Sequence, residues 1–138
     1  MANTKGARRE REFVNLLDDL GYEVIRSPAS GSGTGRDQPD VLFGDGEVLF
    51  VVELKSSGGD PIYLNGEEVD VIRRVADGFG GIPRIGVKFD EKNGDPTWGS
   101  EKQGFYLLKP DDCHVTPGGN VRVKKETAFE KGVLVEDL

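Results

Sequence analysis

The chain has 138 residues, of which 36% are hydrophobic and 31% are charged. This length and composition fit one globular domain over residues 1–138, and no apolar run approaches the roughly 20 residues that cross a bilayer. The basic start of the chain lacks the apolar stretch of a secretory signal, so we expect a cytoplasmic protein with no membrane partner. One cysteine and one histidine exclude an internal disulfide and the usual thiolate or histidine metal sites, which leaves carboxylates to carry the chemistry.

The charge is acidic but uneven along the chain. Against 18 Lys and Arg stand 25 Asp and Glu, which gives a formal net charge of -7. A nucleic-acid-binding protein is normally basic overall, yet the first eleven residues carry four basic side chains against one acid. An acidic excess spread over many segments also suggests a halophilic protein, because concentrated salt screens its self-repulsion.

A first helix is predicted over residues 7–20. Phe13, Leu16 and Leu17 recur at the spacing of one helical face, and Gly21 follows as a stop signal. Three β-type runs come next, over 23–26, 41–43 and 48–55. The last two are separated by GDGE, a plausible hairpin turn that contains Asp45 and Gly46.

A second predicted helix is capped by Asn65 and ends at Gly80. Strands over 84–89 and 105–108 follow, and the polar insertion between them holds Trp98, which either stacks on an exposed base or anchors local packing. The tail predicts a hairpin of residues 114–116 and 121–123 and a short helical turn over 126–131. This order predicts an α/β fold in which helices pack on a mixed sheet.

The run 48–55 ends in two charged residues. Alternate residues of a strand face opposite sides, so Glu53 and Lys55 share a face at the strand end, where on their own they could be a surface ion pair. Asp40 precedes the neighbouring strand, and pairing about Asp45 and Gly46 sets it opposite residues 51–53. Asp40 and Glu53 can therefore converge on one point.

Two facing carboxylates repel unless a cation lies between them, and an oxygen-rich site favours Mg²⁺, with Mn²⁺ as a substitute. We expect Asp40, Glu53, the Leu54 carbonyl and waters as its ligands. Glu10 lies three residues before Phe13 and continues the apolar face of the first helix. It either contacts the metal or is an acid favoured by the positive end of the helix.

The segments KGARRERE, IRSPAS, PDVLFG and VVELKSS, followed by DPIYL and GIPRIGVKF, resemble the archaeal Holliday junction resolvases, a branch of the PD-(D/E)xK nucleases. The resemblance implies a restriction-endonuclease-like mixed β-sheet flanked by α-helices. It also implies a Mg²⁺-dependent endonuclease that acts as a homodimer and resolves four-way DNA junctions by paired cuts. Two strand regions, 82–89 and 105–108, are candidates for the dimer interface, but periodicity does not separate a dimer surface from the core.

By motif position, the resemblance places the active acids, which are also the metal ligands, at Glu10, Asp40 and Glu53, the active lysine at Lys55, and supporting residues at Arg11, Arg26 and Ser30. DNA contacts are expected from Lys5, Arg8, Arg9, Arg11, Arg26 and Arg36, for which solvated charges are the alternative. The Gly-rich loop 30–38 can approach a DNA backbone or serve as a plain connection. It lacks a terminal G-K-[ST], so no nucleotide cofactor is expected.

Lys55 is expected to orient the attacking water and to offset negative charge at the phosphate. Two other interpretations remain open, a PD-(D/E)xK nuclease of different specificity and a catalytically silent DNA-binding module. Cys113 and His114 are adjacent and diverge on a strand, so we expect structural or surface roles for both.

Overall fold

The computed structural model describes residues 5–27, 37–90 and 104–138. The helices are α1 (Lys5–Asp19), α2 (Gly66–Phe79) and α3 (Lys125–Lys131), with short 3-10 helices η2 (Pro110–Asp112) and η3 (Val135–Asp137). The strands are β1 (Glu23–Arg26), β2 (Val41–Gly44), β3 (Leu49–Ser57), β4 (Ile62–Leu64), β5 (Ile82–Phe89), β6 (Tyr106–Leu108), β7 (His114–Val115), β8 (Val121–Val123) and β9 (Val133–Leu134).

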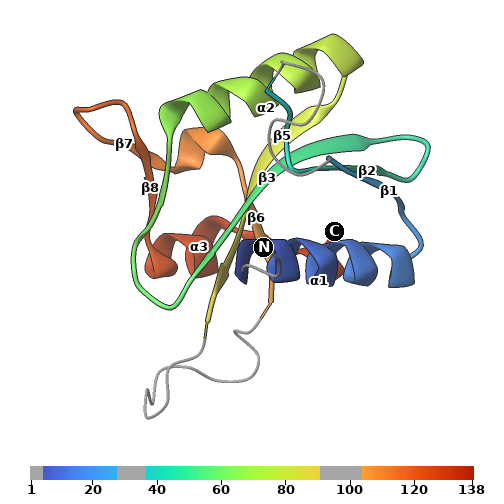
Figure 1. The fold of residues 1–138 in the computed structure, drawn as a ribbon, viewed down its shortest axis with the longest axis horizontal. Coiled ribbons are helices and arrows are strands. Elements are labelled where there is room, and N and C mark those ends of the chain that lie inside the picture. The colour runs from blue at the N-terminus through green and yellow to red at the C-terminus, as the bar shows by residue number, and fades with distance from the viewer. Residues whose placement is uncertain (1–4, 28–36, 91–103) are drawn as a thin grey trace.

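The main sheet has six strands in the order β1-β2-β3-β5-β6-β9. β3 and β5 are parallel and the other neighbours are antiparallel, so the mixed sheet predicted from the sequence is confirmed. β4, β8 and β7 form a separate antiparallel sheet, and the β7–β8 hairpin projects at the left of Figure 1. The hairpin itself was predicted, but its separation from the main sheet was not.

Helices cover both faces of the main sheet (Figure 1). α1 packs on one face, where Phe13 and Leu17 are fully buried in a cluster that includes Val52 of β3. α2 packs on the other face, where Ile72 joins a second cluster with Val51. Adjacent residues of β3 thus pack into different hydrophobic clusters, because successive side chains of a strand point to opposite faces of the sheet.

Hydrogen bonds from nearby backbone N–H groups to side chains fix the two segments that position the site. In the turn between β2 and β3, the Asp45 carboxylate accepts hydrogen bonds from the backbone N–H groups of Glu47 and Val48, each at 2.9 Å, and Gly46 adopts φ 96°. At the start of α2, Asn65 and Glu68 form a capping box, in which each side chain accepts from a backbone N–H of the first turn. The hairpin and the helix start are therefore both fixed by side chains close in sequence.

The strands over 82–89 and 105–108, which are candidates for either a dimer interface or the core, lie inside the main sheet. β5 lies between β3 and β6, and β6 lies between β5 and β9. Their side chains fill the two cores, as Ile85 and Leu108 do at no measurable exposure. Apolar strands in the middle of a sheet and at a subunit interface have the same sequence pattern, so periodicity could not separate them.

No helix in the described ranges combines the length and apolar character that a bilayer crossing needs.

Candidate active site

The β2–β3 hairpin brings Asp40 beside the end of β3. The pairing of β2 with β3 ends with Val41 opposite Val52, so Asp40 is the next residue toward Glu53. The Leu54 backbone N–H donates to Asp40 Oδ2 at 2.8 Å, which fixes the carboxylate against the neighbouring strand. The predicted approach of Asp40 to β3 is therefore present in the structure.

Glu53 and Lys55 lie on the same face of β3, as the alternation predicted. Glu53 is only 6% exposed, which is a low value for a carboxylic acid. The Lys55 ammonium donates to Glu68 Oε2 on α2 at 2.8 Å. The acid and the amine thus lie between β3 and the first turn of α2.

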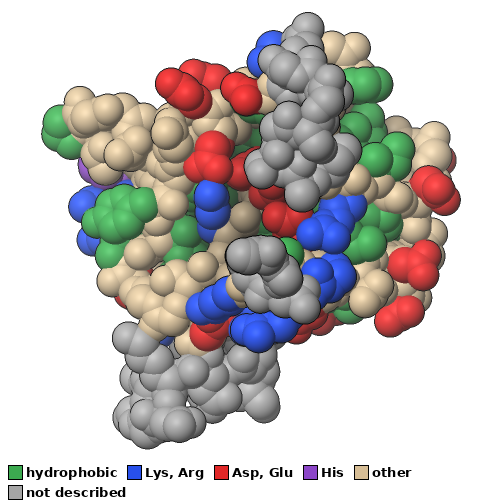
Figure 2. All heavy atoms as spheres, in the orientation of Figure 1, with side chains coloured by type: hydrophobic (Ala, Val, Ile, Leu, Met, Phe, Trp, Pro, Cys, Tyr) green, Lys and Arg blue, Asp and Glu red, His purple; other side chains and the backbone are tan. Residues whose placement is uncertain are grey.

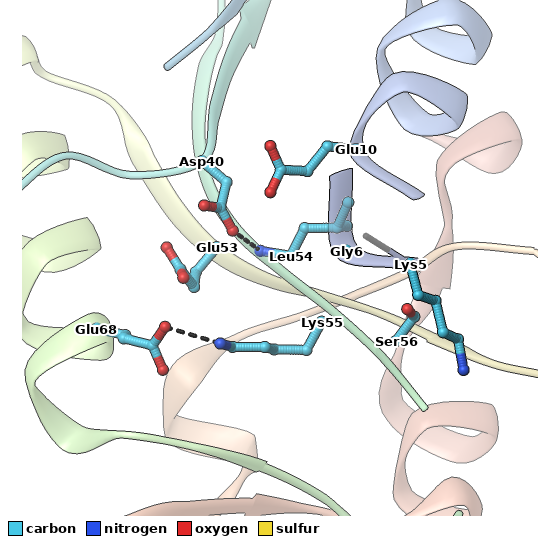
Figure 3. Close-up of a pocket in the computed structure, with 9 residues that line it drawn as sticks. All are labelled: Lys5, Gly6, Glu10, Asp40, Glu53, Leu54, Lys55, Ser56 and Glu68. Carbon is cyan, nitrogen blue, oxygen red and sulfur yellow. Dashed lines mark hydrogen bonds and ion pairs between the residues drawn. The ribbon is translucent and has the colours of Figure 1, made fainter. Parts of the chain in front are cut away.

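Glu10 joins these residues from α1, on the other side of a cavity of about 290 Å³. Figure 3 shows the carboxylates of Glu10, Asp40 and Glu53 gathered at one side of this pocket, while Lys55 extends to Glu68. The pocket is lined by Lys5, Gly6, Glu10, Asp40, Glu53, Leu54, Lys55, Ser56 and Glu68. Four carboxylates from four separate segments of the chain therefore face one cavity.

The electrostatics of the pocket favour a bound positive charge. Burial, together with the nearby Asp40 and Glu68 carboxylates, raises the pKa of Glu53 to about 10. Burial, reinforced by the negative charge of Glu10, raises the pKa of Asp40 to about 6 despite the hydrogen bond from Leu54. Asp40 and Glu53 therefore repel each other when both are ionised, and a bound cation would relieve that repulsion.

The expected ligands, Asp40, Glu53 and the Leu54 carbonyl, fit a hard divalent cation such as Mg²⁺, because they offer carboxylate and carbonyl oxygens. Within the described ranges, however, no group of three His, Cys, Asp or Glu residues is close enough to hold one ion in the present arrangement. Glu10 already has another partner, since its Oε1 accepts from Arg26 Nε at 3.0 Å. To join Asp40 and Glu53 as a metal ligand, Glu10 would have to use its other oxygen or give up this pair.

Two of the predicted DNA-contacting residues are held by an acid at the end of β5. Asp90 accepts from Arg9 Nη2 at 2.7 Å and forms an ion pair with Lys5. Arg9 Nη1 also donates to Glu12 at 2.8 Å, and Glu12 accepts from Lys88. Lys5 and Arg9 therefore tie the start of α1 to β5.

Three of the remaining predicted DNA contacts, Arg8, Arg11 and Arg26, are among the described residues. Arg8 and Arg11 are exposed on α1, and Arg26 pairs with Glu10. Figure 2 shows Asp and Glu side chains at the centre of this face and Lys and Arg side chains along its lower side, over α1. Ser30 and Arg36, with the rest of 28–36, and Trp98 in 91–103 lie outside the described residues.

Glu68 is the pocket residue that the sequence analysis missed. Its spacing from Asn65 is the signature of a capping box, and that role by itself accounts for a glutamate at the start of a helix. The hydrogen bonds from Lys55 and Glu53 lower its pKa against the opposing effect of burial, so it stays ionised. The feature of the sequence that could have revealed Glu68 is the short stretch of chain between Lys55 and the start of the next helix.

Burial raises the pKa of Cys113 to about 11, which makes this thiol a poor nucleophile.

A mixed sheet between helices, with Asp40 ahead of one strand and Glu53 and Lys55 on the next, defines the class of restriction-endonuclease-like nucleases. The structure of the Hjc resolvase of Archaeoglobus fulgidus has the same fold, with a TM-score of 0.76 over 94% of this chain and 95% of that chain, at 21% identity. The expected fold class is thereby confirmed.

The family is shown by sequence comparison. The family model described as archaeal Holliday junction resolvase (Hjc) matches residues 1–138, and the chain belongs to this family. Crossover junction endodeoxyribonuclease Hjc of Sulfolobus acidocaldarius is 40% identical over 136 residues, which cover 98% of this chain and 86% of that protein. Its counterpart from Sulfurisphaera tokodaii is 35% identical over 136 residues, which cover 98% and 85%.

Proposed function

We propose that this protein is a Mg²⁺-dependent endonuclease that resolves four-way DNA junctions by paired cuts. The observation that carries the proposal is the pocket in which Glu10, Asp40 and Glu53 face one cavity beside Lys55, in a chain of the resolvase family. A catalytically silent DNA-binding module would gain nothing from burying Glu53 beside Asp40, since an unneutralised acid pair destabilises the fold.

Each residue has a distinct part in the proposed reaction. Asp40 and Glu53 hold the metal, with Glu10 joining them directly or through water. When bound, Mg²⁺ lowers the pKa of a coordinated water and polarises the scissile phosphate. The neighbouring carboxylates keep Lys55 protonated, as its raised pKa indicates, so Lys55 orients the water and offsets negative charge but does not act as a base.

Junction DNA is the proposed substrate, and a homodimer is the proposed active form. A four-way junction has near two-fold symmetry, so two copies related by a two-fold axis would place one pocket at each of two opposite strands. The basic side chains of α1 and Arg26 would contact the phosphate backbone, which contributes affinity without base sequence. Action on junction DNA supports a cytoplasmic, nucleoid-associated location, which is part of the proposal.

The test compares a synthetic four-way junction, a flap and a linear duplex of the same base composition. We expect paired nicks in the junction with Mg²⁺ or Mn²⁺, no cutting in EDTA, and much slower cutting of the flap and duplex. Equal cutting of all three substrates would contradict junction selectivity. Cutting that persists in EDTA would contradict the metal site. Sedimentation of the protein bound to one junction would report the number of copies.

A further inference from the structure

Glu68 uses both of its carboxylate oxygens, and each has a different partner. Oε1 accepts from the Asn65 backbone N–H at 2.9 Å, and Oε2 accepts from the Lys55 ammonium at 2.8 Å. The first bond belongs to the capping box of α2, and the second crosses to β3. The side chain is therefore clamped at the junction of these two elements.

The helix that carries Glu68 is itself well anchored. Val69, the next residue, is 5% exposed, and Ile72, one turn later, is fully buried against the main sheet. Glu68 and Lys55 are partly buried, with side-chain exposures of 30% and 34%. A carboxylate on a rigid first turn can hold a flexible lysine in one place, which solvent-exposed partners on mobile side chains cannot do.

Lys55 has other acids within reach. Its positive charge lowers the pKa values of both Asp40 and Glu53. Figure 3 shows both carboxylates on the same side of the Lys55 side chain. A lysine has four rotatable side-chain bonds, so a released ammonium would move to the nearest acids. There it would neutralise the groups that are proposed to bind the metal.

We propose that Glu68 is a positioning residue, which holds the Lys55 ammonium at the edge of the pocket and keeps it off Asp40 and Glu53. This inference rests on the proposed function, because it assigns the cation position between those acids to a metal ion. Glu68 thereby sets where Lys55 meets the phosphate and leaves the acid pair open. It does not itself touch the reacting atoms.

The central variant is Glu68→Gln, which retains an oxygen acceptor for the Asn65 N–H and removes the charge that holds Lys55. We expect kcat on junction DNA to fall about 10- to 100-fold, as is typical when a partner of an active-site group is removed. The KM for the junction should be unchanged, and a higher Mg²⁺ concentration should be needed for half-maximal rate. The unchanged KM and the shifted Mg²⁺ requirement separate positioning from a loss of folded protein.

Two controls separate the positioning role from the capping role. Glu67→Gln makes the same charge change one residue away, on an exposed side chain, and should leave kcat and the Mg²⁺ requirement unchanged. Asn65→Ala removes the side-chain oxygen that accepts from the Glu67 N–H at 2.9 Å, but it keeps the backbone N–H that binds Glu68. It should lower the melting temperature and retain kcat.

A readout that needs no cutting is the NMR signal of the Lys55 ammonium in metal-free protein with isotope-labelled lysine, assigned with Lys55→Arg. We expect this signal to shift in Glu68→Gln and to stay in place in Glu67→Gln. An unmoved signal, or an unchanged kcat and Mg²⁺ requirement in Glu68→Gln, would overturn the positioning role. If wild-type protein cuts no junction, the proposed function fails, and the NMR signal still decides whether Glu68 holds Lys55.

Discussion

Replacing Glu53 with Gln should stabilise the metal-free protein at neutral pH while it abolishes cutting. The pKa of Glu53 is about 10 in the folded protein, against an ordinary value of 4.5. At pH 7 the unfolded chain therefore has an ionised Glu53, and folding must return a proton to it. Each pH unit above 4.5 costs about 1.4 kcal/mol, so the penalty at pH 7 is about 3 kcal/mol.

The sign of the pH dependence follows from the raised pKa. Below pH 4.5 both states are protonated and the penalty is absent. It grows as the pH rises and would level off only above the folded pKa. A glutamine escapes this penalty, because it has no proton to regain and its amide N–H groups can donate to Asp40 and Glu68. The stability gain of Glu53→Gln should therefore be near zero at pH 4.5 and largest above pH 7.

The measurement is chemical denaturation in EDTA at a series of pH values. Glu47→Gln is the matched control, because it makes the same carboxyl-to-amide change in the exposed turn between β2 and β3. Adding Mg²⁺ should stabilise the wild type and have little effect on Glu53→Gln, since a ligand stabilises only the state that binds it. A Glu53→Gln protein that is less stable than wild type at pH 7, or a gain that ignores pH, would refute the reasoning.

Three further predictions concern the catalytic lysine, the ion pairs of α1 and the acidic surface. Lys55→Ala should bind junction DNA in a gel-shift assay while its cutting rate falls about 100- to 1000-fold; a parallel loss of binding would contradict the assigned role. Asp90→Asn leaves Lys5 and Arg9 without their shared acid and should cost about 1 to 2 kcal/mol in urea denaturation. Because these partners lower the pKa of Asp90, that difference should shrink as the pH falls through the ordinary aspartate range; a constant difference would speak against the pairs. If the acidic composition is an adaptation to salt, the melting temperature should rise when molar KCl replaces dilute buffer, and a fall would reject that origin.

The part of the site that could be predicted depends on local geometry. Alternation along β3 fixes the common face of Glu53 and Lys55, and the turn at Asp45 and Gly46 sets the register that brings Asp40 near them. Glu10 followed from the helical spacing that also buries Phe13. Each of these inferences spans one element or one hairpin, and periodicity and turn chemistry determine structure at that range.

The missed features depend on contacts between distant segments. The Lys55–Glu68 pair requires the crossover from β3 through α2 to β5, and the Arg9–Asp90 pair joins residues 81 positions apart. β4 and β9 have only three and two residues, and short runs carry too little pattern to be recognised without their partners. The sequence thus predicted the acids of the pocket better than the partners that hold its cations.

Arg26 links the acids of the pocket to the side chains that are proposed to contact DNA. Arg26 is held by Glu10, so the same carboxylate that would bind the metal now neutralises a residue proposed to contact phosphate. If metal binding drew Glu10 out of this pair, Arg26 would be free for a phosphate, and a phosphate bound to Arg26 would likewise free Glu10. By linkage, each ligand must then strengthen the binding of the other by the same factor. In that case metal and DNA together would displace an internal ion pair that either ligand alone would have to break.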